Sequence, residues 1–130
     1  MRVLQPPGWA KPKGYANGIS AKGTLVFAAG QIGWTADGRF ETDAFAGQFA
    51  QALRNVVAVC QEAGAKPEHI VRLAWFITSK RDYLASIAEI GGAYRDIMGR
   101  HYPTMTVVEV SALIEDRAKI EIEATAVVPE

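Results

Sequence analysis

Two segments of the chain repeat apolar side chains at the three- and four-residue spacing of an amphipathic helix. The first helix is predicted over about residues 43–63, where Thr42 or Asp43 can cap the free amides. The second is predicted over about residues 81–98, because Gly99 is a natural stop. Each helix carries one apolar stripe, so each is expected to pack one side against a sheet.

Strands are predicted around these helices. Residues 15–29 have the pattern of two short strands joined by a turn at Gly23, which can adopt a positive φ. Residues 70–78 are β-branched and aromatic, and residues 105–110 and 118–128 close the chain as two further strands. The predicted order β-β-(β)-α-β-α-β-β indicates an α+β domain, with two helices packed on one face of a mixed sheet.

The predicted strand at residues 70–78 is apolar on both sides. Leu73 and Trp75 point to one face, and Ala74 and Phe76 point to the other. Two helices can cover only one face of the sheet, so the second face is expected to pack against other copies of the chain. The pattern therefore predicts a homo-oligomer, although it does not fix the number of subunits.

Composition narrows the class of protein. The 130 residues are 49% hydrophobic, which fits one domain over residues 1–130 with its own core. Fourteen basic residues balance fourteen acidic ones, so no nucleic-acid or membrane-surface partner is expected. The chain has one cysteine, no secretory signal and no apolar run of the roughly 18–20 residues that a membrane span needs. These features favour a cytoplasmic protein.

Strong catalytic and cofactor motifs are absent from the sequence. It contains no GxxxxGK[ST], GxGxxG, HExxH, CxxC or GxSxG pattern. His69 and His101 are far apart, and Cys60 lies on the apolar stripe of the first helix, where it is interpreted as a small hydrophobic residue. No metal or other cofactor is therefore expected. His69 is interpreted as structural, while a site role stays open for His101.

The last strand carries two carboxylates, Glu121 and Glu123, on the side opposite Ile120 and Ile122. If that side is solvated, both are ordinary surface groups. If it is a subunit interface, one of them lies in a partly dry cleft and can hold or deprotonate a water molecule. Periodicity leaves both alternatives open.

Five segments in order resemble a known family. They are Gly-Tyr at 14–15, LVFAAGQIG at 25–33, VVAVCQEAGA at 56–65, PTMTVVEV at 103–110 and IEIEATAV at 120–127. Together they resemble the reactive-intermediate deaminase (Rid or YjgF) family, over almost the whole chain. The resemblance implies a chorismate-mutase-like fold and a homotrimer, with a central barrel of sheets and clefts between the subunits. It also implies hydrolysis of reactive imines and enamines to carbonyl compounds and ammonia.

The resemblance implies roles for individual residues. Glu121 corresponds to the carboxylate that positions the attacking water, and Tyr15 to a tyrosine that completes the catalytic pocket. Met105 occupies the position of the arginine that binds the substrate carboxylate. The substrate-binding candidates at matching or adjacent positions are Ala29, Gly30, Gln31, Gly33, Trp34, Met105, Thr106 and Val107.

Three departures from the family pattern make the predicted pocket more apolar. Methionine at position 105 offers none of the donors of arginine, and losing such charge-assisted bonds costs about 1.5–3 kcal/mol, or roughly tenfold to 150-fold in affinity. Ala29 replaces the family serine, and Val107 replaces a frequent cysteine.

Three interpretations stay open. The preferred one is an imine or enamine hydrolase that uses Glu121 on a different substrate, with aminomuconate-like compounds among the candidates. That substrate is neutral, or its carboxylate binds one of the arginines Arg72, Arg100 and Arg117. The second is a non-catalytic trimer that binds a small metabolite, and the third is an interaction or chaperone-like protein. An endoribonuclease, another label used for this family, is disfavoured because the chain has neither a basic surface nor paired histidines.

Overall fold

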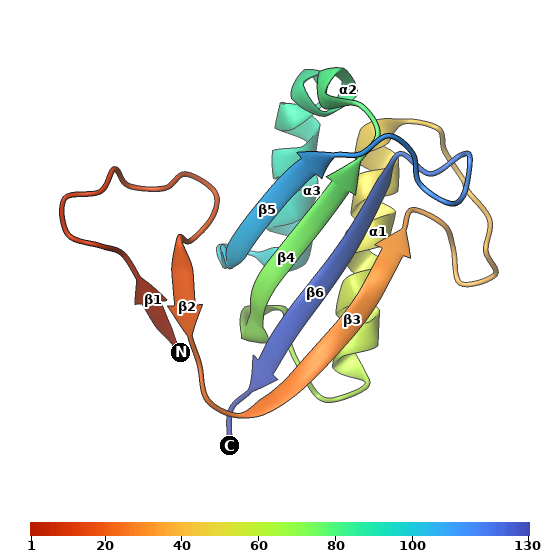
Figure 1. The fold of residues 1–130 in the computed structure, drawn as a ribbon. Coiled ribbons are helices and arrows are strands. Elements are labelled where there is room, and N and C mark those ends of the chain that lie inside the picture. Colours follow the sequence, from red (N-terminus) through yellow and green to blue (C-terminus); the bar gives the residue numbers. More distant parts are fainter.

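A four-stranded mixed sheet forms the centre of the computed structural model, which describes residues 1–130 (Figure 1). In spatial order the strands are β3 (Thr24–Ile32), β6 (Ile120–Val128), β4 (Ile70–Ile77) and β5 (Thr104–Glu109). The β4–β5 pair is parallel and the other two pairs are antiparallel. The sheet is therefore mixed, as predicted.

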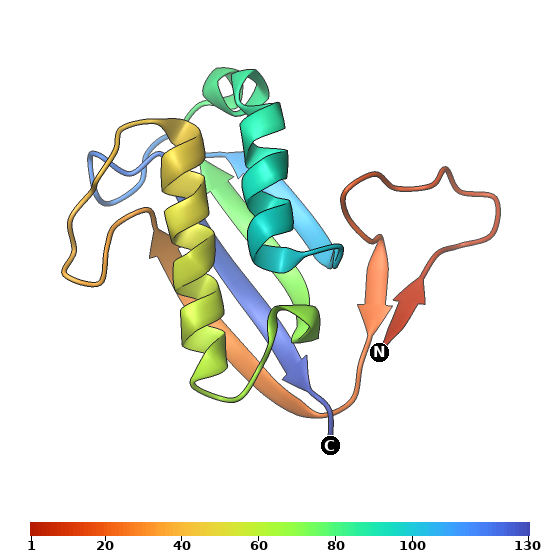
Figure 2. The same ribbon diagram turned by 180° about the vertical axis from the view of Figure 1, so that it is seen from behind.

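The long helices α1 (Phe45–Gln61) and α3 (Ile87–Met98) lie side by side across one face of the sheet (Figure 2). A 3₁₀ turn at Pro67–His69 precedes β4. This arrangement confirms the α+β fold, with the helices on one face of the sheet. None of the helices has both the length and the apolar character to span a membrane.

The second predicted helix is divided in the structure. A short helix, α2 (Lys80–Ala85), precedes α3, and Ser86 between them has a non-helical backbone with φ −109° and ψ 10°. The Ser86 amide donates to the Tyr83 carbonyl, which closes α2 with a tight turn. Apolar spacing continues across the break, so periodicity alone predicted one continuous helix.

The two strands near the N-terminus belong to different sheets. The strand β2 (Gly18–Ser20) pairs with β1 (Arg2–Leu4) and not with β3. Gly23 has a positive φ of 152° and lets β3 start beside the end of β6, where a Cβ would overlap the Val128 carbonyl. The two strands predicted within residues 15–29 are confirmed, and the connection at Gly23 joins strands of two different sheets.

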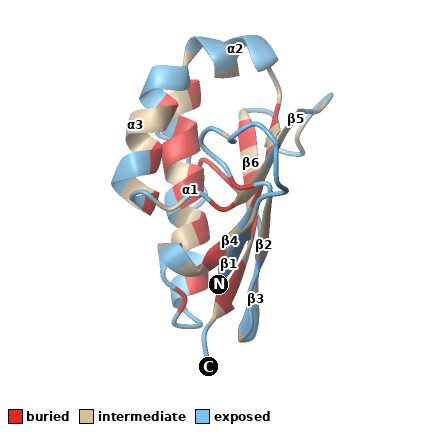
Figure 3. Ribbon diagram, turned by 90° about the vertical axis from the view of Figure 1, so that its left-hand side faces the viewer, coloured by how far each residue is buried: buried red, intermediate tan, exposed pale blue.

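The main core lies between the sheet and the helices (Figure 3). Phe49 of α1 packs on Trp75 of β4, with ring centroids 4.8 Å apart. The opposite face of the sheet has no helix over it (Figure 3), and Leu25 and Phe27 are 59% and 70% exposed there. The prediction that two helices leave one sheet face uncovered is confirmed.

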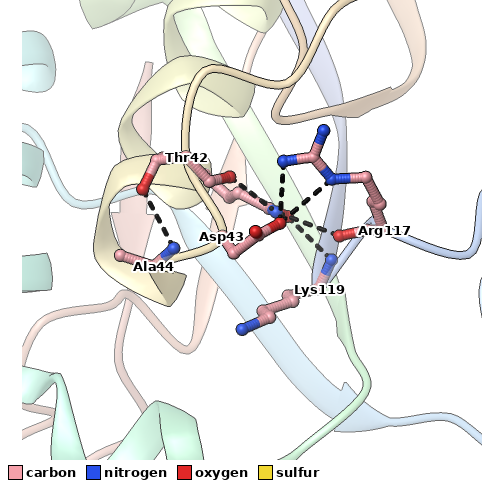
Figure 4. Close-up of polar contacts among 6 residues, drawn as sticks. Thr42, Asp43, Ala44, Arg117 and Lys119 are labelled. Carbon is pink, nitrogen blue, oxygen red and sulfur yellow. Dashed lines mark hydrogen bonds and ion pairs between the residues drawn. The ribbon is translucent and has the colours of Figure 1, made fainter.

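A buried glutamine joins the start of α1 to the start of β6. The Gln48 side chain is fully buried; its Nε2 donates to the carbonyls of Thr42 (3.1 Å) and Arg117 (3.0 Å), and its Oε1 accepts from the Lys119 amide (2.8 Å). Figure 4 shows these partners converging, together with the ion pair between Arg117 and Asp43 at 2.9 Å. This junction fixes the chain immediately before Glu121.

The predicted side-chain cap of the first helix is absent. The N-cap residue is Ala44, whose amide donates to the Thr42 hydroxyl at 3.0 Å, and no side chain accepts from the helix amides. Asp43 turns instead toward Arg117 (Figure 4). The Asp43 carboxylate, which was expected to cap the helix, therefore forms an ion pair with Arg117 instead.

Candidate active site

A cavity of about 510 Å³ lies between α3, the edge strand β5 and the N-terminal segment. Its size is within the usual range for small-molecule sites, about 300–1,000 Å³. Nine of its thirteen lining residues are hydrophobic. The lining consists of Lys13, Gly14, Tyr15, Trp75, Tyr83, Ile87, Ile90, Gly91, Tyr94, Arg95, Tyr102, Met105 and Val107.

Three predicted site residues meet in this cavity: Tyr15, Met105 and Val107. Met105 and Val107 alternate along β5 on the side that faces the helices, opposite Leu73 and Trp75 of β4. A single parallel bridge between Ala16 and Thr104 brings Tyr15 to the same edge.

Thr106 lies on the other side of the sheet from the cavity. It pairs in register with Ala74 and is exposed. Its hydroxyl therefore does not line the cavity formed by its neighbours in the sequence.

Glu121 also lies on the uncovered face of the sheet. It is half-buried, and its register neighbours are Phe76 on β4 and Ile32 on β3. The carboxylate lies directly over Gly30, at the irregularity of β3, where any Cβ would overlap it. Glu121 forms no ion pair, whereas Glu123 on the same face pairs with Arg72 at 3.5 Å. Gly30 and Glu121 thus form a second candidate cluster.

Within one chain, Glu121 and Gly30 lie apart from the cavity residues Tyr15, Met105 and Val107. Glu121 is on β6 and Met105 is on β5, with β4 between these strands, and their side chains point to opposite faces of the sheet. A site that uses both residues therefore needs a second copy of the chain.

The remaining candidates on and after β3 lie outside the cavity. Ala29 is exposed, and its carbonyl accepts from the Gln31 amide group at 3.1 Å. Gln31 and Trp34 line a shallower depression of about 240 Å³ against α1. Gly33 packs on α1, since a Cβ there would be only 2.6 Å from the Gln48 Cα. Close helix packing therefore accounts for Gly33.

The structure distinguishes the arginines that sequence reasoning grouped together. Arg72 and Arg117 are paired with Glu123 and Asp43, and Arg100 does not line the cavity. Arg95 does line it and has no acidic partner, although sequence reasoning did not select it. The sequence carried one signal that could have pointed to Arg95. It lies four residues, about one helical turn, after Gly91, so both residues are on the same side of the helix.

Two tyrosines of the cavity, Tyr83 and Tyr94, are held in their neutral form. Burial raises the pKa of Tyr94 well above its usual value, and the neighbouring Tyr102 raises the same pKa further. The Tyr94 hydroxyl donates to the His101 carbonyl at 2.6 Å, and its ring stacks on Tyr102 with centroids 5.3 Å apart. Burial also raises the pKa of Tyr83. These side chains therefore contribute rings and neutral hydroxyls to the cavity at physiological pH.

Two buried polar groups bear on the chemistry. The indole N–H of Trp75 is buried and has no hydrogen-bond partner, although Trp75 lines the cavity. Burial raises the pKa of the Cys60 thiol, which disfavours the reactive thiolate. No three His, Cys, Asp or Glu side chains lie together as metal ligands do.

The chain is similar to known proteins in both sequence and structure. A family model described as Endoribonuclease L-PSP matches residues 9–128. A 2-iminobutanoate/2-iminopropanoate deaminase of Salmonella typhimurium is 32% identical over 116 residues, covering 87% of this chain and 86% of that protein. A RutC family protein of Synechocystis is 34% identical over 136 residues, covering 99% and 98% of the two chains.

Solved structures agree with these sequence matches. The Rid family protein YyfB of Yersinia pestis superimposes with a TM-score of 0.84 at 29% identity, over 98% of both chains. TdcF of Escherichia coli, solved with bound serine, gives a TM-score of 0.69 at 32% identity, over 98% of this chain and 99% of that one. The chain therefore belongs to the Endoribonuclease L-PSP family, whose members are also called Rid and YjgF proteins, and the predicted family is confirmed. The family includes proteins named imine deaminases.

Proposed function

We propose that this protein hydrolyses a reactive imine, or the enamine that tautomerises to it, to a carbonyl compound and ammonia. In this reaction a water oxygen bonds to the imine carbon, the C=N bond breaks, and the nitrogen leaves as NH₃ with protons that water supplies. The observation that carries the proposal is the half-buried Glu121 carboxylate, which lies over Gly30 and has no cationic partner.

An unpaired carboxylate at this position suits water activation. A carboxylate without an ion pair keeps its acceptor sites for a water molecule and can accept a proton from it. Gly30 leaves the carboxylate the space that a side chain would fill. The names of the Salmonella typhimurium and Escherichia coli deaminases support the same reaction type.

The proposed site forms between two copies of the chain in a homotrimer. The uncovered sheet face exposes Leu25, Phe27 and Val108, the kind of apolar surface that subunits bury against one another. In the proposed assembly this face turns inward. Glu121 and Gly30 of one subunit then meet the cavity that Tyr15 and Met105 line in the next.

Within such a cleft each residue has a distinct role. Glu121 accepts a proton from the attacking water as the oxygen approaches the imine carbon. The Tyr15 hydroxyl, which is partly exposed at the cavity, donates a hydrogen bond to the substrate nitrogen as the C=N bond breaks. Met105 and Val107 provide an apolar wall where the family pattern has an arginine.

A second candidate function is a trimer that binds a small metabolite without turnover. The observation that favours it is the apolar cavity wall at Met105, which lacks the charge that would orient a carboxylate there. In this alternative Glu121 is an ordinary interface carboxylate.

Ammonia release with a matched pair of variants tests the proposal. Imines are generated in the assay from a panel of amino compounds, with and without a carboxylate, and the loss of imine is followed with and without the protein. Glu121→Gln is expected to lower the rate by about 10²–10⁴-fold, the usual contribution of a general base. Glu123→Gln is the control, because Glu123 is on the same strand and face but pairs with Arg72.

The outcomes separate the two functions. Light scattering on each variant establishes that the assembly is intact. Full activity of Glu121→Gln would refute the proposed mechanism. A wild-type protein that accelerates the hydrolysis of no imine in the panel would favour the metabolite-binding alternative.

A further inference from the structure

We infer that the cavity beside β5 selects a substrate with an aromatic side chain and a carboxylate, and that Arg95 of α3 binds this carboxylate. This inference rests on the proposed function for the reaction, but it concerns ligand class and can be measured without turnover. In the family pattern, an arginine at position 105 on β5 binds the substrate carboxylate. This chain has methionine there, so the inference assigns the anion-binding role to α3.

Aromatic side chains dominate the cavity. Trp75, Tyr83, Tyr94, Tyr102 and Tyr15 all line it. Aromatic rings pack favourably in edge-to-face and offset-stacked arrangements, and thioethers make favourable contacts with ring edges. Met105 lines the same cavity and supplies such a thioether. A substrate with an aryl group matches this lining better than one with a short aliphatic chain.

The charges that a single chain contributes to the cavity lining have one sign. Lys13 and Arg95 are the only charged residues that line the cavity, and no acidic residue does. Neither cation is in an ion pair. A cationic ligand would be repelled, although the rings alone would suit one. The lining therefore favours an anion, and a guanidinium fork matches the geometry of a carboxylate.

The Arg95 head lies beside Gly91 on α3. The two residues are one helical turn apart on α3, and a Cβ at position 91 would lie 3.4 Å from the Arg95 Nη1 atom. The guanidinium therefore folds back across the helix turn that lines the cavity, over a position without a side chain. Arg95 is exposed and lines the cavity, so its cation is accessible to a ligand there.

Strand register orients the proposed ligand. Tyr15 and Tyr102 lie next to the start of β5, and Arg95 is in the last turn of α3, which leads to β5. Val107 and its register partner Trp75 lie further along the strand. A carboxylate at Arg95 thus directs the side chain of the ligand toward Trp75.

Calorimetric titration with four matched probes tests the inference. The probes are 3-phenylpropanoate, propanoate without the ring, 3-phenylpropan-1-ol without the charge, and 3-phenylpropan-1-amine with the opposite charge. We expect 3-phenylpropanoate to bind most tightly. The ring contributes roughly tenfold or more in affinity over propanoate, which is the usual effect of burying a large apolar side chain.

Two arginine variants assign the anion contact. Arg95→Gln is expected to weaken 3-phenylpropanoate binding by about tenfold or more, while leaving 3-phenylpropan-1-ol binding unchanged. Arg54→Gln, an exposed arginine of α1 that does not line the cavity, is the control and should bind both probes like the wild type. Arg95 is exposed, so both variants are expected to fold.

The outcomes are distinct from those of the hydrolysis assay. Arg95-dependent binding of 3-phenylpropanoate without imine hydrolysis would support the ligand class and reject the proposed reaction. Glu121-dependent hydrolysis of small aliphatic imines, with no binding of 3-phenylpropanoate, would support the reaction and overturn the inference. Binding that Arg95→Gln does not weaken would also overturn it.

Discussion

Replacing Gln48 with alanine should destabilise the fold strongly, because this side chain joins two segments that are far apart in the sequence. Gln48 is fully buried and makes three hydrogen bonds, to the carbonyls of Thr42 and Arg117 and from the amide of Lys119. Alanine leaves these three backbone groups without their partner. It also opens a cavity where α1 meets the start of β6.

The expected loss follows from those bonds. A buried polar group left unsatisfied costs about 1–3 kcal/mol, and water entering the cavity can satisfy some of the three. We therefore expect the free energy of unfolding to fall by about 3–5 kcal/mol. For a domain of this size that corresponds to a melting temperature lower by roughly 10–20 °C.

Urea titration and thermal melting at one fixed protomer concentration measure the effect, since oligomer stability depends on concentration. The control is Gln51→Ala on the same helix, which removes one hydrogen bond, donated by the Gln51 Nε2 to the Asn55 Oδ1 at 2.8 Å, and should cost about 1 kcal/mol or less. Gln48→Glu keeps the acceptor for Lys119 but loses the two donors, so it should also be strongly destabilising. A Gln48→Ala protein within about 1 kcal/mol of the wild type would refute the role of Gln48 at this junction.

Three further predictions concern other parts of the chain. Gly30→Ala should displace the Glu121 carboxylate and lower imine hydrolysis about tenfold or more without unfolding the protein, and unchanged turnover would count against their contact. Gly92→Ala should raise the free energy of unfolding by up to about 1 kcal/mol, since no atom lies within 4 Å of the added Cβ; a loss of stability in denaturant titration would contradict this. The raised pKa of Tyr94 means that the folded state keeps its proton above pH ~10, where the unfolded chain loses it. Wild-type stability should therefore fall above pH ~10 more steeply than that of Tyr94→Phe, and parallel pH profiles would disprove the linkage.

Much of the fold could be predicted from local pattern. The stripe of α1, the alternation of β6 and the doubly apolar β4 each follow from side chains close in sequence, and the structure confirms these elements. The break at Ser86 and the pairing of β1 with β2 could not be predicted in this way. The break at Ser86 changes the backbone of one residue and leaves the apolar spacing intact. The pairing of β1 with β2 depends on which strands meet in space, and this is not specified by the residues within either strand.

The sequence by itself determined the family, the α+β class and the candidate residues, because these depend on residue types and their spacing. Only the tertiary structure decided which candidates meet: Tyr15 and Met105 share a cavity with Arg95, while Glu121 and Gly30 lie on the opposite face of the sheet. Which strand lies beside which, and which face each side chain takes, depends on contacts between residues far apart in the chain. The spacing of residues along one segment does not contain that information.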